Sequence, residues 1–281
     1  MTPTHKAVIM ARGLGSRMRR ADAAASLDAA QARAADAGMK AMIPIDRPFL
    51  DYVISALADA GITDVCLIIG PEHQAIRDHY AQGLTRVRVH FAVQTEPRGT
   101  ADAIAAAEAF AGSDTFLALN ADNYYPVEAY RQLAAVGGAG LVGFDAAALV
   151  RDSNIPAERV RAFALVTVGE NDAGSRPSPG HVPSGRPGLD PGPSAVGLPH
   201  LVEIIEKPDE ATYQRLAPHA LVSMNLWSFT PAIFAACRRV QPSVRDELEL
   251  QDAVRIARAD LGVPFRVVPF AGGVLDLSHR G

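Results

Sequence analysis

The sequence contains little cysteine and few aromatic residues. Among its 281 residues are two cysteines and one tryptophan, and 6% are aromatic. Cys66 and Cys237 lie in apolar stretches far apart in the chain, so we expect free buried thiols in a reducing, cytoplasmic environment rather than a disulfide framework. No cluster of Cys and His has the spacing of a zinc site. The chain is therefore not expected to depend on covalent or metal cross-links for its fold.

Two further absences exclude whole classes of protein. The net charge is −4, and without a basic surplus to displace phosphate counterions we expect no general binding to nucleic acid. No apolar run approaches the roughly 20 residues of a membrane span, and the N-terminal Met-Thr-Pro-Thr-His-Lys lacks the apolar core of a signal peptide. With 48% apolar and 21% charged residues, the composition is typical of one globular domain spanning 1–281, without membrane association.

What the sequence does contain is an alternation of apolar runs and amphipathic segments. This rhythm predicts an α/β protein with a Rossmann-like, three-layer α/β/α architecture and a mostly parallel mixed sheet. We expect strands at 7–10, 64–70, 87–93, 115–119, 163–168, 200–206, 224–229 and 265–270. We expect helices at 48–60, 71–82, 101–110, 231–240 and 246–260.

A segment rich in Pro, Gly and Ser separates the strands expected at 163–168 and 200–206. Residues 171–199 carry Pro or Gly at nearly every second or third position, which prevents a regular element. The flanking strands make sense only as a paired hairpin. We therefore interpret 171–199 as a disordered insertion rather than a domain boundary.

Several polar or glycine residues directly follow expected strands. They are Gly13, Gly15, Gln94 and Asp122. Because ligands bind beyond the carboxyl ends of the strands in such sheets, these residues should converge on one edge.

The first forty residues contain the clearest candidate for a phosphate site. Gly13 and Gly15 break the first apolar run and offer backbone N–H groups with no side chain in the way, and Arg17 and Lys40 add two cations. A tight turn without a ligand explains the same glycines. The pattern is neither a dinucleotide fingerprint nor a P-loop. The Ala-rich segment 19–38 is expected to be helical, as a lid over the phosphates or as a connecting surface helix.

Five stretches, in order, carry a resemblance to a known family. They are Met10-Ala-Arg-Gly-Leu-Gly-Ser-Arg17 with Lys40-Ala-Met-Ile-Pro-Ile45, Gln94-Thr-Glu-Pro-Arg-Gly-Thr-Ala-Asp-Ala103, Ala121-Asp-Asn123, Ile205-Glu-Lys-Pro208 and Val274-Leu-Asp276. Together they resemble the motifs of the sugar-1-phosphate nucleotidyltransferases, the nucleotide-sugar pyrophosphorylases, and are similar to glucose-1-phosphate thymidylyl- and uridylyltransferases. The similarity extends over roughly residues 6–278 and implies a GT-A-like nucleotidyltransferase fold.

The resemblance implies a reaction in which a sugar-1-phosphate oxygen attacks the α-phosphorus of a nucleoside triphosphate in line and pyrophosphate leaves. It implies that Mg²⁺ is held by Asp122 and Asp276, since Mg²⁺ prefers carboxylate, water and phosphate oxygens. Catalytic roles are implied for Arg17, Lys40, Asp122 and Lys207. Arg17 and Lys40 would stabilise the triphosphate and the leaving pyrophosphate.

Binding roles follow in the same way. The implied nucleotide-binding residues are Ala11, Arg12, Gly13, Leu14, Gly15, Ser16, Gln94, Gly99 and Thr100. Gln94 would pair with the base edge through an amide that offers both donor and acceptor, and Gly99 would let the backbone approach the base. The implied sugar-phosphate residues are Asn123, Glu206, Lys207 and Asn225, with Glu206 on sugar hydroxyls and Lys207 on the phosphate.

Each role has a structural alternative. Asp122 could cap a turn, Gln94 could be a hydrogen-bonded strand end, and Lys207 could be a solvated hairpin charge. The segment 247–252 is interpreted as acidic helix surface without chemistry. The eight histidines suggest no catalytic triad.

Three departures from the family pattern stand out. Arg12 occupies the position of a second glycine, which leaves two interpretations: a tighter turn, or a contact between Arg12 itself and phosphate. Asn225 replaces a glycine of the sugar pocket, which suggests an altered acceptor. Val274 and Ser278 replace the residues usually found around Asp276.

The predicted function is Mg²⁺-dependent joining of a nucleoside triphosphate, with UTP or dTTP favoured, to a sugar-1-phosphate. Two alternatives stay open: the same chemistry on a cyclitol or other non-sugar phosphate, and a catalytically silent nucleotide-sugar-binding regulatory protein. A nicotinamide dehydrogenase is disfavoured because Gly70-Pro71 occupies the place of the acidic ribose ligand. A homo-oligomer is possible on the resemblance.

Overall fold

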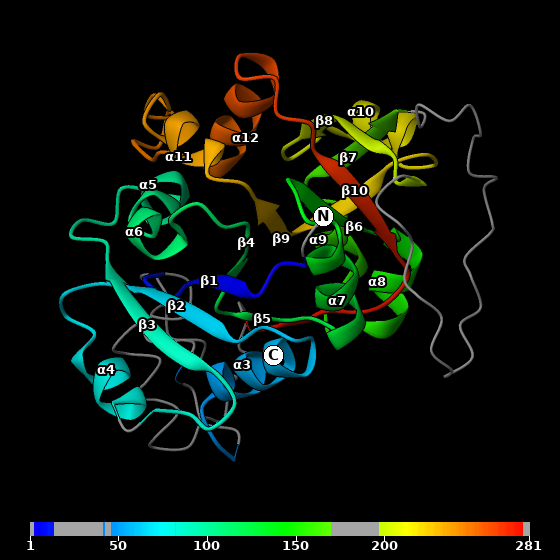
Figure 1. Ribbon diagram of the computed structural model, residues 1–281. Coiled ribbons are helices and arrows are strands. Elements are labelled where there is room, and N and C mark those ends of the chain that lie inside the picture. The colour runs from blue at the N-terminus through cyan, green and yellow to red at the C-terminus, as the bar shows by residue number, and fades with distance from the viewer. Residues whose placement is uncertain (1–2, 14–41, 43–45, 82, 170–196, 278–281) are drawn as a thin grey trace.

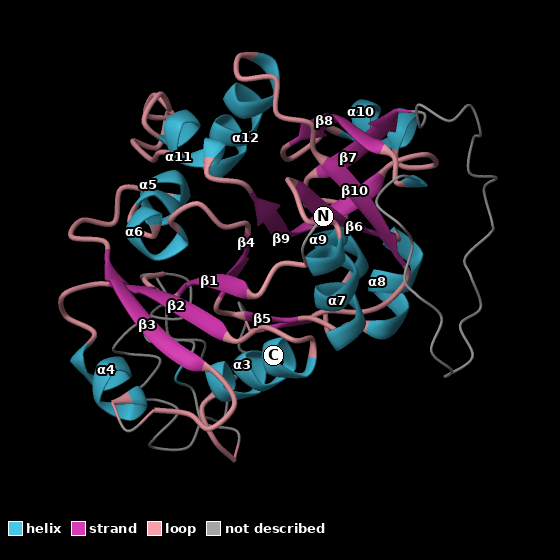
Figure 2. Ribbon diagram, viewed as in Figure 1, coloured by secondary structure: helices cyan, strands magenta, loops and turns pink. Residues whose placement is uncertain are grey.

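The fold, a computed structural model, is an α/β domain built on a nine-stranded mixed sheet (Figures 1 and 2). The structure describes residues 3–13, 42, 46–81, 83–169 and 197–277. The strands of the sheet, in chain order, are β1 (Lys6–Met10), β2 (Asp64–Ile69), β3 (Arg88–Val93), β4 (Phe116–Asn120), β6 (Gly140–Phe144), β7 (Leu165–Gly169), β8 (His200–Ile205), β9 (Leu221–Phe229) and β10 (Arg266–Phe270). A separate two-stranded sheet joins β5 (Asn123–Tyr124) to β11 (Leu275–Asp276).

The strand order of the large sheet is β3-β2-β1-β4-β9-β6-β10-β8-β7. β3, β2, β1 and β4 are parallel, β9 runs antiparallel to both β4 and β6, and β10 is parallel to β6. β8 is antiparallel to its neighbours β10 and β7. All strands except β9 and β8 therefore run the same way, which confirms the predicted mostly parallel mixed sheet.

Helices cover both faces of this sheet (Figure 2). The described helices are α3 (Phe49–Asp59), α4 (Gln74–Tyr80), α5 (Thr100–Ala105), α6 (Glu108–Ala111), α7 (Val127–Ala135), α8 (Ala146–Asp152), α9 (Ala157–Val160), α10 (Glu210–Leu216), α11 (Ala232–Cys237) and α12 (Leu250–Ala259).

The pleat of β1 shows how the sequence separates the two layers. Ala7 and Ile9 pack into the cluster formed with α3 and α7, whereas Val8 packs into the cluster formed with α5, α11 and α12. Successive side chains of a strand point to opposite faces, so a continuous apolar run such as Ala7–Ile9 requires a cover on each side. The three-layer prediction is confirmed.

Some expected elements differ from those observed. The helix expected at 101–110 is divided into α5 and α6, and α12 begins at Leu250 rather than near residue 246. The sequence analysis proposed no element between 123 and 160, where α7, β6, α8 and α9 lie. β6 has the sequence Gly-Leu-Val-Gly-Phe, whose glycines weaken the strand signal.

The hairpin expected around the Pro/Gly/Ser-rich segment is confirmed as β7 and β8, which pair from Leu165↔Ile205 to Gly169↔His200. The expected insertion 171–199 is too long at its end. Leu198 is buried, and the Pro199 carbonyl accepts a hydrogen bond from the Val267 N–H (2.8 Å). Residues 170–196, like the helix expected at 19–38, lie outside the described residues.

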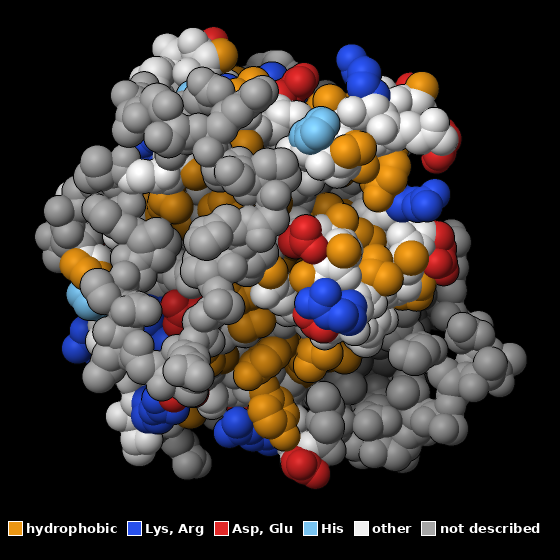
Figure 3. Space-filling model, turned by 90° about the vertical axis from the view of Figure 1, so that its right-hand side faces the viewer, with side chains coloured by type: hydrophobic (Ala, Val, Ile, Leu, Met, Phe, Trp, Pro, Cys, Tyr) orange, Lys and Arg blue, Asp and Glu red, His pale blue; other side chains and the backbone are white. Residues whose placement is uncertain are grey.

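Both cysteines are free and buried, as expected. Burial withdraws each thiol from water and raises the pKa of Cys66 to about 12 and that of Cys237 to about 12. Within the described ranges no helix is both long enough and apolar enough to cross a bilayer. Figure 3 shows one face of the molecule, on which basic and acidic side chains are interspersed rather than gathered by sign.

The start of β2 is tied to β3 by a charged cluster. Asp64 accepts hydrogen bonds from Arg88 Nε and Nη2, at 2.7 Å each, and from the Thr63 hydroxyl at 2.8 Å, and His90 Nε2 lies 3.2 Å away. The hydrogen bonds from Arg88 are the main reason that the pKa of Asp64 lies well below its usual range.

Asp64→Asn should therefore reduce stability at neutral pH and flatten its acid dependence. A carboxylate with a lowered folded-state pKa contributes stability above the unfolded-state pKa, and that contribution disappears as the pH falls toward the folded-state value. The difference in melting temperature between variant and wild type should be constant above about pH 5 and should narrow progressively as the pH falls below about 4. Parallel curves would show that the Asp64 carboxylate makes no net contribution.

Candidate active site

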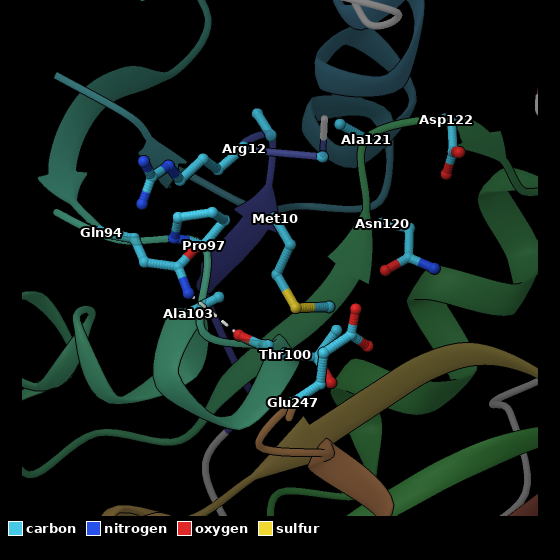
Figure 4. Close-up of a pocket in the computed structure, with 13 residues that line it drawn as sticks. Met10, Arg12, Gln94, Pro97, Thr100, Ala103, Asn120, Ala121, Asp122 and Glu247 are labelled. Carbon is cyan, nitrogen blue, oxygen red and sulfur yellow. Dashed lines mark hydrogen bonds between the residues drawn. The ribbon is translucent and has the colours of Figure 1, made fainter. Parts of the chain in front are cut away.

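A cavity of about 370 Å³ opens at the carboxyl ends of β1, β3 and β4 (Figure 4). Its lining comes from segments far apart in the sequence, namely Met10, Ala11, Arg12, Gly13, Gln94, Pro97, Gly99, Thr100, Ala103, Asn120, Ala121, Asp122 and Glu247. Gly13, Gln94 and Asp122 thus converge, as their positions after strands predicted. Gly15, the fourth residue of that prediction, lies outside the described residues.

Backbone hydrogen bonds just past the strand ends fix this convergence. The Ala11 N–H donates to the Ile68 carbonyl (2.9 Å), the Gln94 N–H donates to the Ile69 carbonyl (2.9 Å), and the Ala121 N–H donates to the Met10 carbonyl (3.3 Å). Each bond continues the parallel ladder by one residue. Main-chain hydrogen bonds therefore fix the residues of the cavity floor to the sheet.

The Gln94 side chain is held from within the protein. It is buried, and its amide Nε2 donates to the Gly99 carbonyl and to Asp102 Oδ2, at 2.9 Å each. Both N–H donors of the amide are thereby engaged, so the group left for a ligand is the carbonyl oxygen. The sequence analysis predicted that the Gln94 amide offers the base both a donor and an acceptor. In the structure only its acceptor oxygen is left for a ligand.

Gly99 makes a backbone contact that the sequence analysis did not predict. Its φ is +117°, and a Cβ placed on it would lie 2.5 Å from both the backbone N and the backbone O of Leu248. The Leu248 N–H donates to the Arg98 carbonyl (2.7 Å), and the Leu248 carbonyl accepts from the Ala101 N–H (2.8 Å). Glycine is required here because the two backbones touch, whether or not a base lies nearby.

The same junction orders the start of α12. Thr100 Oγ1 accepts a hydrogen bond from the Leu250 N–H (2.9 Å), which satisfies one of the unpaired donors at the helix terminus. The loop before it places Glu247 in the cavity wall. The interpretation of Glu247 as acidic helix surface was wrong, because α12 begins three residues later and Glu247 belongs to the loop.

Asn120 is a second lining residue that the sequence analysis missed. It ends β4 and directly precedes the segment that carries Asp122. The rule that polar residues at strand ends face the ligand would have selected it. For Glu247 no such rule was available, because its position depends on the contact between Leu248 and Gly99.

The two carboxylates predicted to hold a metal are brought together by the small sheet. β11 pairs with β5 so that Asp276 lies opposite Asn123, and the Leu277 N–H donates to the Asp122 carbonyl (2.9 Å). Burial above all raises the pKa of Tyr125, and the charges of Asp122 and Asp276 both add to that rise. The two carboxylates therefore lie within electrostatic reach of one phenol.

Asp276 is fixed on two sides. Its backbone exchanges two hydrogen bonds with the side chain of Asn154, at 2.8 and 2.9 Å. Its buried carboxylate lies 3.2 Å from Arg159 Nη2. The described residues contain no group of three or more His, Cys, Asp or Glu side chains that could hold a metal.

The predicted sugar-phosphate residues Glu206, Lys207 and Asn225 do not line the cavity itself. Glu206 and Lys207 directly follow β8, and Lys207 has a φ of +43°. Gln251 connects the group to α12, since its Nε2 donates to Asn225 Oδ1 (3.3 Å) and its side chain also hydrogen-bonds Glu206. This cluster therefore adjoins the loop that carries Glu247.

Asn225 has a φ of +59° within β9, where the pairing with β6 shifts register. Asparagine is among the side chains that adopt this left-handed conformation most readily. The residue therefore preserves a backbone shape that favours glycine. Its presence in place of glycine does not by itself require a different acceptor.

The remaining predicted residues have mixed outcomes. Asn123 is buried in β5 and is not part of the cavity wall. Ala11, Arg12 and Thr100 line the cavity. Leu14, Gly15, Ser16, Arg17 and Lys40 lie outside the described residues.

Gly99→Ala should destabilise the protein more than a positive φ alone requires. Gly61 has a φ of +94°, and a Cβ placed on it would have nothing within 4 Å, so Gly61→Ala is the matched control. We expect about 1 kcal/mol of destabilisation for Gly61→Ala, from backbone strain. For Gly99→Ala we expect about 2 kcal/mol or more, because the Leu248 backbone must also move. Urea unfolding of both variants measures the difference, and equal losses would contradict a close backbone contact.

Comparison with known proteins identifies similar chains. Residues 34–140 match the family described as Nucleotidyl transferase. A UTP–glucose-1-phosphate uridylyltransferase of Streptococcus pyogenes serotype M1 is 25% identical over 284 residues, covering 90% of this chain and 78% of the relative. An enzyme of the same name from Streptococcus pneumoniae serotype 4 is 26% identical over 272 residues, covering 89% and 78%.

Solved structures show the same fold. A UDP-glucose pyrophosphorylase crystallised with UDP-glucose superposes with a TM-score of 0.68 at 17% identity, covering 98% of this chain and 94% of that one. The UTP-bound enzyme from Acinetobacter baumannii gives a TM-score of 0.64 at 17% identity, covering 98% and 89%. Together with the family match over residues 34–140 and the convergence of the strand-end motifs on one cavity, these likenesses support the resemblance: the chain is similar to the sugar-1-phosphate nucleotidyltransferases.

Proposed function

We propose that this chain joins a nucleoside triphosphate to a sugar 1-phosphate, giving a nucleoside diphosphate sugar and pyrophosphate. The observation that carries the proposal is the order of groups around one cavity. Gln94 and Asp122 lie on opposite sides of the cavity (Figure 4), and Gly99 and Thr100 belong to its lining. Glu206 and Lys207 lie outside the cavity lining, in the cluster that adjoins the loop of Glu247. A base, an α-phosphate and an acceptor therefore each have a matching set of groups.

The donor set fits a hard divalent cation such as Mg²⁺. Asp122 and Asp276, joined through the β5–β11 pairing, supply carboxylate oxygens, while the described residues add no His or Cys to them. Mg²⁺ is commonly bound by one or two carboxylates, with phosphate and water oxygens completing its shell. Bound there, it would neutralise charge on the phosphates and polarise the α-phosphorus.

The protein's own groups contribute positioning and charge. Arg159 beside Asp276 limits the repulsion between two neighbouring carboxylates and holds Asp276 in one orientation. Lys207, at the end of the β8 segment, would bind the phosphate of the acceptor, and Glu206 would accept hydrogen bonds from its hydroxyls. No covalent intermediate is needed, so bringing the attacking oxygen into line with the α-phosphorus supplies much of the rate enhancement.

For the substrates, we propose UTP and glucose 1-phosphate as the first pair. The two streptococcal relatives are UTP–glucose-1-phosphate uridylyltransferases, and the two solved structures contain UDP-glucose or UTP. The remaining acceptor on Gln94 suits the imide N–H of uracil. The same imide occurs in thymine, so dTTP is the matched comparison.

The first test is pyrophosphate release with Mg²⁺ across a panel of nucleoside triphosphates and sugar 1-phosphates. We expect turnover with UTP or dTTP and a hexose 1-phosphate. Triphosphate binding without turnover on any acceptor in the panel would favour the regulatory alternative. Absence of both binding and turnover would refute the proposal.

Asp122→Asn and Asp276→Asn should each reduce kcat by about 100-fold or more, because each removes a charge from the proposed metal site. Asp114→Asn is the matched control, since Asp114 precedes β4 at the opposite end of the strand and pairs with Lys6 on the surface. Steady-state kinetics and circular dichroism on the three variants separate catalysis from folding. Near-normal turnover of Asp122→Asn would remove the metal assignment.

Glu206→Gln should raise stability at neutral pH while weakening acceptor binding. Although the residue is exposed, its carboxyl is crowded by neighbouring groups; this desolvation, followed by the charge of Glu249, raises the pKa of Glu206. Stability associated with the protonated form is present below the unfolded-state pKa and is lost as the pH rises through the folded-state pKa.

The glutamine variant has no proton to lose, so its melting temperature should exceed that of wild type above the raised pKa and approach it in acid. Thermal melts from about pH 4 to about pH 7 measure this difference. The KM for the sugar 1-phosphate should rise in the same variant. A KM that does not change would exclude Glu206 from the acceptor site.

A further inference from the structure

Arg12, which follows β1, is an unusual residue in the cavity wall. It is only 8% exposed, and two of its guanidinium nitrogens, Nε and Nη1, are buried and have no hydrogen-bond partner among the residues that the structure describes. Its third nitrogen, Nη2, lies 3.6 Å from Glu72 Oε1. A buried cationic donor without a partner is costly, so its retention in a cavity wall indicates that a ligand completes its hydrogen bonds.

The position of Glu72 gives the direction of the Arg12 side chain. Glu72 lies three residues beyond Ile69, the last residue of β2, and Ile69 pairs with Val93 of β3. Gln94 follows Val93 directly. Arg12 therefore extends from β1 across β2 toward β3, whereas Asp122 follows β4 on the opposite side of β1. Figure 4 shows the guanidinium on the side of Gln94 and Pro97, away from Asn120 and Asp122.

Glu72 is itself held in place. His73, buried beside it, has Nε2 3.7 Å from Glu72 Oε1, and its Nδ1 accepts a hydrogen bond from the Gly70 N–H (3.4 Å). A Cβ on Gly70 would overlap the Glu72 carboxylate. The turn after β2 thus places an acidic group where it orients the guanidinium of Arg12 without enclosing it.

Building on the function proposed above, we propose that Arg12 is a base-recognition residue, which donates from its unpaired N–H groups to a carbonyl oxygen of the nucleobase. Gln94 presents its remaining amide oxygen on the same side of the cavity. One acceptor and one cationic donor match the imide edge of uracil or thymine, which offers an N–H between two carbonyls. Glu72 is the positioning residue that aims the guanidinium.

The competing assignment is a contact between Arg12 and the β- or γ-phosphate. A phosphate contact would be made by UTP and not by uridine, so an Arg12 variant would then lose affinity for UTP alone. A contact to a base carbonyl would be made by both ligands, so both would lose affinity alike. Arg12→Met, which removes the guanidinium, and Arg12→Lys, which keeps the charge without the planar fork, therefore distinguish the two assignments when both ligands are measured.

The experiment compares the affinities of UTP and of uridine, which has no phosphate, by calorimetry and by ligand-detected NMR. For Arg12→Met we expect affinity to fall by about 10-fold for both ligands, in equal proportion. Arg12→Lys should recover little of that loss. A loss confined to UTP, or recovery of wild-type affinity by lysine, would overturn the proposal in favour of a phosphate contact.

Thio-substituted nucleotides supply a second readout that folding alone does not change. Sulfur is a weaker acceptor than oxygen, so wild type should bind UTP more tightly than 2-thio-UTP or 4-thio-UTP, whichever carbonyl Arg12 contacts. Arg12→Met should lose that discrimination, and Glu72→Gln should reduce it. Equal discrimination in all three proteins would exclude both residues from base recognition.

The stability of the unliganded protein is a third measurement. Because Nε and Nη1 of Arg12 have no partner within the described part of the chain, Arg12→Met should melt no lower than wild type without nucleotide and lower than wild type at saturating UTP. A variant that melts lower without ligand would show that Arg12 is structural. Failure of the proposed function appears separately, as wild type that binds UTP or uridine without releasing pyrophosphate on any sugar 1-phosphate.

Discussion

The contact between the backbones of Gly99 and Leu248 is the constraint on which the site depends. It joins the segment after β3 to the loop before α12, and the hydrogen bond from the Leu250 N–H to Thr100 Oγ1 strengthens the same junction. The Gln94 amide donates to the Gly99 carbonyl, so this junction also fixes the position of the Gln94 side chain. The same junction fixes the position of Glu247, which lies one residue before Leu248. The Gln94 side of the cavity is thereby connected, through a few main-chain atoms, to the loop that adjoins Glu206, Lys207 and Asn225.

On the Asp122 side of the cavity, the pairing of β5 with β11 is a second contact between distant segments. β5 and β11 contribute only two residues each, but their pairing brings the end of the described chain back to Asp122. Asn154 holds Asp276 through two reciprocal hydrogen bonds, and Ser153 Oγ accepts from the Val274 N–H (2.8 Å). The geometry of the two carboxylates therefore depends on the α8–α9 connection, which touches neither phosphate nor sugar in the proposed reaction.

Comparison of sequence and structure shows which signals are local. Apolar runs such as Val65–Ile69 predict buried strands because every residue faces a helix layer, and the rule for strand ends correctly brought Gly13, Gln94 and Asp122 together. Glu247 was missed because its position depends on Leu248 meeting Gly99, a contact between distant segments. The pairing of Asp276 with Arg159 was likewise outside what a motif could predict. The contact of Gly99 with Leu248 was missed for the same reason, since a motif does not show which backbone approaches a glycine.

The burial of Cys66 and Cys237 has a practical consequence. With a pKa of about 12 each, both thiols stay protonated in neutral solution, and the sheet and helices shield them from reagents. A cysteine engineered at any exposed position would then be the one reactive thiol among the described residues. The natural sequence can accordingly carry a fluorophore or spin label at a chosen site, without prior removal of its own cysteines and without disturbing the core.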